Sequence, residues 1–173
     1  MKNLFGIVVL LVCFFSFNGI AQSNVVGIQI GNKAPEIVEK SITGQTLKLS
    51  SLSGKIVLID FWASWCKPCR NENPAVVAAY EKYKNSSFKG GNGFTVFSVS
   101  LDKDGSAWKA AVKDDKMNWV NHVCLLNSQA GYIQSYNISM IPTNFLIDGN
   151  GIIIASNLRG EALEEKLNAL KKN

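Results

Sequence analysis

The sequence contains few of the residues that build metal centres and disulfide frameworks. Its 173 residues include four cysteines, three methionines and one histidine. Removal of the N-terminal leader described below would leave three cysteines, which cannot all pair with one another. A scaffold held together by several disulfides is therefore excluded. No tract rich in His or Met supports a copper-carrying function.

Clustered charge and long apolar runs are also scarce. The net charge is +5, but it is spread along the chain and gives no footprint of nucleic-acid binding. An apolar run over residues 4–17 is shorter than the ~20 residues of a spanning helix. It follows Lys2 and leads to small residues ending at Ala21, as in a secretory signal peptide. We expect cleavage after Ala21 and an exported, periplasmic chain; an uncleaved anchor is the alternative.

The rest of the chain shows no internal repeat and no inner domain boundary. We expect a signal peptide over residues 1–21, a lead-in over 22–34 and one domain over 35–173. Expected strands cover residues 36–40, 46–49, 55–61, 94–100, 120–126, 141–148 and 152–155; expected helices cover 67–84, 106–115, 130–136 and 161–172. We expect Ser106 to cap its helix, Pro74 to kink the first helix and residues 88–93 to form a Gly-rich loop. This alternation predicts an α/β domain.

The strongest motif is WASWCKPC at residues 62–69. An apolar, β-branched segment of strand length precedes it, and a helical pattern follows. The two cysteines therefore lie at a strand-to-helix junction, where free backbone N–H groups and the helix dipole stabilise a thiolate. A Cys-x-x-Cys pair in this setting indicates redox chemistry.

These residues, with Glu72 and an Ile-Pro-Thr segment before a later strand, resemble the thioredoxin superfamily. Within it, the chain is similar to the exported TlpA/ResA-like thiol–disulfide oxidoreductases, which are related to the AhpC/TSA proteins. The resemblance covers about residues 34–170 and implies a thioredoxin-like fold. That fold has a central mixed sheet flanked by helices, an N-terminal β-hairpin and an inserted helix–strand segment near residues 103–126.

The resemblance implies a function for each residue of the motif. Cys66 would be the nucleophile, since a sulfur at a helix N-terminus ionises readily, and Cys69 would resolve the mixed disulfide. Lys67 adds positive charge beside the thiolate, and Pro68 favours the first helical turn. Trp65 offers an apolar docking surface, whereas we expect Trp62 in the core.

Three further positions match the family's substrate-binding and proton-transfer residues. Pro142 matches a cis-proline that faces the cysteines, and Ile141 before it would contact the substrate. Asp60 matches the buried carboxylate of thioredoxin, and Glu72 matches the carboxylate of ResA-like proteins. Either carboxylate could take the proton of Cys69, with a pKa raised by burial. Structural roles are the alternative: Asp60 capping nearby backbone and Glu72 in solvent.

Two other functions use the same cysteines. A peroxiredoxin-type peroxidase would carry Thr or Ser three residues before the nucleophile, where this chain has Ala63. A Cu(I) or Zn carrier would use Cys66 and Cys69 as ligands, and zinc could add His122 and Cys124. We expect no metal, an inert buried thiol at Cys124 and a surface or strand-edge position for His122.

The sequence thus predicts an enzyme whose redox group is the Cys66–Cys69 pair, with no other cofactor. The resemblance implies protein thiols and disulfides as substrates, a reductase direction, a membrane-embedded electron donor and a role such as cytochrome c maturation. We expect a monomer that binds no nucleic acid.

Overall fold

A computed structural model describes residues 25–126 and 131–172 of the chain. The predicted signal peptide and Ala130 lie outside these residues. The strands are β1 (Val38–Lys40), β2 (Thr46–Lys48), β3 (Ile56–Trp62), β4 (Ser87–Phe88), β5 (Gly91–Asn92), β6 (Phe94–Ser100), β7 (His122–Cys124), β8 (Thr143–Ile147) and β9 (Ile153–Ser156). The helices are α1 (Lys67–Tyr83), α2 (Gly105–Asp114), α3 (Gly131–Ser135) and α4 (Glu161–Leu170), with a 3₁₀ turn at Leu49–Leu52. In these two ranges, no helix combines the length and apolarity required to cross a lipid bilayer.

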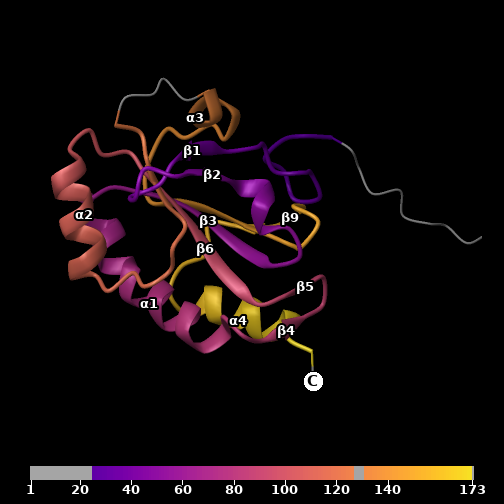
Figure 1. Cartoon of the computed structure of the whole chain (residues 1–173). Coiled ribbons are helices and arrows are strands. Elements are labelled where there is room, and N and C mark those ends of the chain that lie inside the picture. Colours follow the sequence, from indigo (N-terminus) through magenta and orange to yellow (C-terminus); the bar gives the residue numbers. More distant parts are fainter. Residues whose placement is uncertain (1–24, 127–130, 173) are drawn as a thin grey trace, which may run out of the picture.

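Five strands form one mixed sheet in the order β7-β6-β3-β8-β9. The first three of these are parallel, and β8 and β9 run antiparallel to their neighbours. Helix α3 lies on one side of the sheet, and α1 and α4 lie together on the other (Figure 1). This arrangement confirms the predicted thioredoxin-like α/β fold with a central mixed sheet.

The central strand β3 is buried along its whole length because both faces of the sheet are covered. Its side chains alternate between two core clusters, as the pleat requires. Leu58 and Trp62 pack with buried residues of α1, α2 and α4. Ile59 and Phe61 pack on the opposite face with Tyr136, which follows α3. Packing on both faces therefore fixes the position of the carboxyl end of β3, where the Cys-x-x-Cys motif begins.

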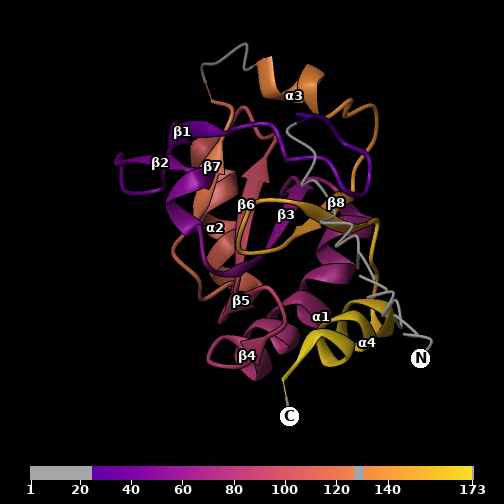
Figure 2. The same ribbon diagram turned by 90° about the vertical axis from the view of Figure 1, so that its right-hand side faces the viewer.

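The predicted N-terminal hairpin and inserted segment are both present and lie side by side. Strands β1 and β2 pair antiparallel around Gly44, whose φ of +84° suits glycine. A bridge between Ser41 and Val123 joins this hairpin to β7 of the inserted segment (Figure 2). The insertion therefore extends the sheet on the side where β1 and β2 lie.

The predicted loop at residues 88–93 is wrong in part, since β4 and β5 form a short hairpin there. Its turn packs against two other glycine turns at the end of the sheet opposite the cysteines. Gly149 donates to the Gly90 carbonyl over 2.7 Å, and a Cβ on Gly149 would lie 2.6 Å from that oxygen. This contact between distant turns orders a segment that the sequence alone predicts as loop.

The cap of α2 also differs from the prediction. Asp104, and not Ser106, is the N-cap residue, and its carboxylate accepts hydrogen bonds from Ser106 N–H and Ala107 N–H. Both are favourable capping residues, so composition alone does not distinguish them. Helix α1 continues through Pro74 as one helix, and the kink stays a prediction.

The predicted surface position of His122 is wrong, although β7 is an edge strand. The His122 side chain is buried, stacks on Trp119 at 5.3 Å and has Nε2 3.1 Å from the Met117 carbonyl oxygen. Burial lowers the pKa of His122 from 6.5 to about 4, so the ring is neutral at pH 7.

This burial predicts a loss of stability in mild acid. Between pH 6.5 and 4 the unfolded chain binds a proton at His122 that the folded chain does not, so stability falls as the pH falls. We expect this residue to lower the free energy of unfolding by up to about 3 kcal/mol at pH 4 relative to pH 7. Urea titrations of the wild type and a His122→Phe variant across this range measure the difference. Equal pH slopes in the two proteins would contradict the prediction.

Candidate active site

The two motif cysteines form a disulfide at the N-terminus of α1. Cys66 is the N-cap residue, and its Sγ accepts a hydrogen bond from Cys69 N–H at 3.2 Å. Cys66 is 5% exposed and Cys69 1%, so Cys66 is the more accessible of two largely covered residues in the oxidised form. The helix N-terminus provides the backbone donors and positive potential that stabilise a thiolate at Cys66 after reduction.

A buried carboxylate holds the turn that connects β3 to the cysteines. Asp102, two residues after the end of β6, accepts hydrogen bonds from Ser64 N–H at 2.8 Å and Ser64 Oγ at 2.5 Å. It also accepts from Ser100 Oγ at 2.6 Å. Three donors satisfy the charge of a side chain that is 2% exposed. The backbone just before Trp65 and Cys66 is thereby fixed to the neighbouring strand.

An ion pair holds the first turn of α1 from the other side. Arg70 donates from Nε and Nη2 to the two carboxylate oxygens of Asp115 at the end of α2. Its Nη1 also donates to the Ser64 carbonyl at 3.3 Å, and Asn73 donates to Asp115 at 2.6 Å. This two-pronged geometry fixes the orientation of α1 as well as its position.

The predicted substrate-contacting residues lie around the disulfide. The Ile141–Pro142 peptide bond is cis, as the resemblance implies. Ile141 is half-buried and packs against the core cluster that contains both cysteines. Trp65 is 67% exposed, an unusual degree for such a large apolar side chain. Lys67 and Pro68 are exposed on the first turn of α1.

Asp60 and Glu72 lie close enough for their charges to interact. Asp60 is 5% exposed, and burial is the main cause that raises its pKa to about 7. Glu72 raises this pKa further, whereas the positive charge of Arg159 lowers it. Glu72 is half-buried and accepts a hydrogen bond from Gly160 N–H at 2.5 Å, so it is not free in solvent.

The remaining cysteine and histidine are not gathered at this site. Cys124 is buried, as predicted, and burial raises the pKa of its thiol to about 11. The described residues contain no group of three or more His, Cys, Asp or Glu side chains that could hold a metal ion. The four-ligand zinc alternative with His122 and Cys124 is thus not assembled there. Ala63 is buried and supplies no hydroxyl for a peroxide, while Trp62 lies in the core as predicted.

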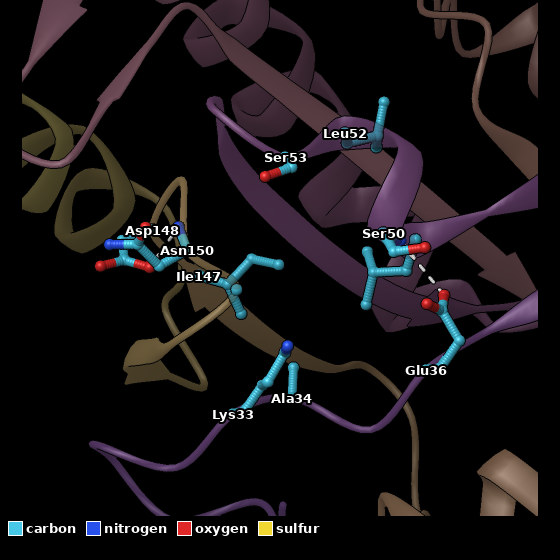
Figure 3. Close-up of a pocket in the computed structure, with 11 residues that line it drawn as sticks. Lys33, Ala34, Glu36, Ser50, Leu52, Ser53, Ile147, Asp148 and Asn150 are labelled. Atoms are coloured by element: carbon cyan, nitrogen blue, oxygen red, sulfur yellow. Dashed lines mark hydrogen bonds between the residues drawn. The ribbon is translucent and has the colours of Figure 1, made fainter. Parts of the chain in front are cut away.

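Two of the hollows on the surface of the described residues bear on the position of the site. A small pocket of about 120 Å³ lies at the end of the sheet away from the disulfide, and Lys33 points into it between Ile147 and Glu36 (Figure 3). It contains no cysteine. A wider hollow of about 350 Å³ lies beside the disulfide and is lined by Ser64, Trp65, Leu101, Asp102, Lys103, Asp104 and Ala107. Only the second lies where a partner could approach Cys66.

Sequence reasoning missed three residues that shape the site: Arg70, Asp102 and Arg159. Asp102 follows a predicted strand parallel to β3, and the carboxyl ends of parallel strands lie at the same sheet edge. The position of Asp102 after this strand could therefore have identified it from the sequence as a residue near the cysteines. Arg70 adjoins Cys69, but its partner Asp115 is 45 residues away. No local pattern indicates that pairing.

Comparison with known proteins agrees with this geometry. The AhpC/TSA family model matches residues 30–156. The chain is 33% identical over 150 residues to the thiol-disulfide oxidoreductase ResA of Bacillus anthracis, covering 84% of this chain and 78% of that protein. Its identity to the ResA of a Bacillus cereus strain is 31% over 140 residues, covering 81% and 75%.

Solved structures show the same likeness. The thioredoxin domain of a thiol-disulfide oxidoreductase from Bacteroides vulgatus superimposes with a TM-score of 0.74 at 33% identity, covering 83% of this chain and 98% of that one. A putative thiol:disulfide interchange protein DsbE from Chlorobium tepidum gives a TM-score of 0.71 at 31% identity, with the same coverage. With its Cys66–Cys69 pair at the start of α1, this chain belongs to the AhpC/TSA family and, within it, to the ResA-like thiol–disulfide oxidoreductases.

Proposed function

We propose that this oxidoreductase is exported and reduces disulfides in partner proteins, with electrons supplied by a membrane-embedded donor. The observation that carries the exchange reaction is the Cys66–Cys69 disulfide at the N-terminus of α1. The predicted leader over residues 1–21 and the use of one close cysteine pair support export. The ResA-like resemblance favours the reductase direction and cytochrome c maturation as the setting.

The exchange proceeds in two displacements. The Cys66 thiolate attacks one sulfur of the partner disulfide, which forms a mixed disulfide and releases the other partner sulfur as a thiolate. The Cys69 thiolate then attacks Cys66 Sγ, which restores the Cys66–Cys69 disulfide and releases the second partner thiolate. Two electrons pass from the enzyme to the partner. The greater exposure of Cys66 supports its role as the first nucleophile.

The second displacement requires that Cys69 lose its proton. Asp60 fits this role best, since its pKa of about 7 lets it be unprotonated and still accept a proton at neutral pH. The Glu72 carboxylate is engaged with Gly160 N–H, and its charge raises the pKa of Asp60. We therefore assign proton acceptance to Asp60 and a supporting charge to Glu72.

The partner docks over the exposed apolar surface around the disulfide. Trp65 and the hollow beside it lie on one side, and Ile141 of the cis-proline loop packs against the core cluster that contains both cysteines. Met140, which is 73% exposed, extends this apolar surface. Exposed apolar side chains that gather beside a reactive group are typical of a protein–protein interaction site. An extended partner segment with apolar side chains beside its cysteine fits this face.

The order of the two displacements is testable by trapping. In a Cys69→Ser variant the mixed disulfide cannot be resolved, so we expect a stable adduct with a disulfide-containing peptide, visible by mass spectrometry under non-reducing conditions. A Cys66→Ser variant should form no adduct. Adducts through Cys69 in the second variant, and none in the first, would contradict the assignment.

The proton acceptor is testable with matched amides. We expect Asp60→Asn to slow mixed-disulfide resolution at pH 7 about 100-fold and Glu72→Gln to slow it less than tenfold. Taken alone, Asp60 lowers the stability of the wild type as the pH rises from about 4 to 7, opposite to the effect of His122, because folded Asp60 stays protonated where unfolded Asp60 has ionised. Asp60→Asn should therefore be more stable than the wild type at pH 8, by up to about 4 kcal/mol. A larger rate loss in Glu72→Gln would reverse the assignment.

A further inference from the structure

The connector between β9 and α4, residues 157–160, lies against the site from the side opposite Asp102. Asn157 N–H donates to the Asn144 carbonyl at 2.8 Å. The Asn144 side chain makes two hydrogen bonds to Leu158, at 2.9 Å to its N–H and 2.8 Å to its carbonyl. Asn144 is 1% exposed and stands opposite Asp60 in the β3–β8 pairing. The connector is thus fixed to the strand that follows the cis-proline.

Arg159 extends from this connector to the cis-proline loop. Its Nη2 donates to the Pro142 carbonyl at 2.5 Å, and its Nη1 donates to the Leu158 carbonyl at 2.7 Å. The side chain is half-buried, so solvent competes less for these donors than at an exposed position. No carboxylate forms an ion pair with Arg159 within the described residues. Its main contact with the rest of the site is therefore the backbone of Pro142.

The same guanidinium acts on the proton-transfer groups. Its charge favours the ionised form of Asp60, against the effects of burial and of Glu72. Glu72 in turn accepts a hydrogen bond from Gly160 N–H, the residue next to Arg159. One short segment therefore contacts the cis-proline loop and Glu72 and places a positive charge near Asp60.

We propose that Arg159 is a positioning residue for thiol–disulfide exchange, which holds the Pro142 carbonyl in place and brings a positive charge to the side of the site where Asp60 and Glu72 lie. This inference rests on the proposed function, in which Asp60 accepts the Cys69 proton and the cis-proline loop receives the partner. Arg159 then has two effects that can be separated experimentally. The hydrogen bond acts on partner binding, and the charge acts on proton transfer.

The two effects are separable with two substitutions. Arg159→Met removes both the positive charge and the N–H donors. Arg159→Lys keeps the positive charge but replaces the planar guanidinium and its fixed N–H donors by an ammonium group. Lys48→Met, on the exposed face of β2 and outside the site, is the control for loss of one positive charge. Each protein is assayed from pH 5 to 9 against a peptide that contains one intramolecular disulfide, with dithiothreitol to regenerate the dithiol after each turnover and a blank without enzyme.

We expect Arg159→Met to raise the KM for the peptide about threefold to tenfold and to move the midpoint of the pH–kcat profile up by about half a unit or more. Arg159→Lys should restore the midpoint to within about 0.2 unit of the wild type but keep the raised KM. Lys48→Met should match the wild type in both quantities. Unchanged KM and midpoint in Arg159→Met, or a loss of thermal stability alone, would overturn the proposal.

A second measurement needs no substrate and separates failure of this proposal from failure of the proposed function. Carbon-13 NMR of the Asp60 carboxyl group follows its titration directly, and the Thr143 amide resonance reports on the Pro142 carbonyl. If the wild type reduced no peptide, the proposed function would fail. The positioning role of Arg159 would still be confirmed by a higher titration midpoint of Asp60 and a shifted Thr143 amide resonance in Arg159→Met. It would be refuted if neither changed.

Discussion

The hydrogen bonds from Ser64 to the buried Asp102 carboxylate are the interactions on which the site depends most. Packing on both faces fixes β3 up to Trp62, and α1 begins at Lys67, so residues 63–66 alone determine where the disulfide lies. Asp102 binds the middle of this turn to the end of β6. Arg70 joins the same Ser64 backbone to Asp115. These hydrogen bonds therefore tie the turn that carries the cysteines to β6 and to the end of α2.

The charged side chains of the site influence one buried acid, Asp60. Burial and Glu72 oppose the ionisation of Asp60, and Arg159 favours it, which leaves its pKa near neutral. A carboxyl group in water would be a weak base at this pH, and one buried without a nearby cation would stay protonated. The proposed proton transfer would give this buried acid a function that offsets its cost in stability at neutral pH.

Local pattern was sufficient to predict an α/β fold and the reactive pair, and the family resemblance implied the thioredoxin-like topology. Runs with apolar residues on both faces mark β3 and β6, and the Cys-x-x-Cys motif lies between a strand and a helix. Features that depend on distant contacts were not predictable in this way. The hairpin at β4 and β5 depends on Gly149, His122 is buried against Trp119, and Arg159 meets Pro142 only in the folded chain. The roles of Trp65, Glu72 and Asp60 stay predictions.

The most direct test of the central claim is the redox equilibrium of residues 22–173 against dithiothreitol or glutathione, followed by tryptophan fluorescence. Trp65 adjoins Cys66 and should report reduction of the disulfide. We expect a reversible two-electron transition with a potential nearer to the −270 mV or so of thioredoxin than to the −120 mV or so of DsbA, absent in a Cys66→Ser variant. A potential near that of DsbA would make the protein an oxidase. No reversible transition at all would contradict the exchange mechanism.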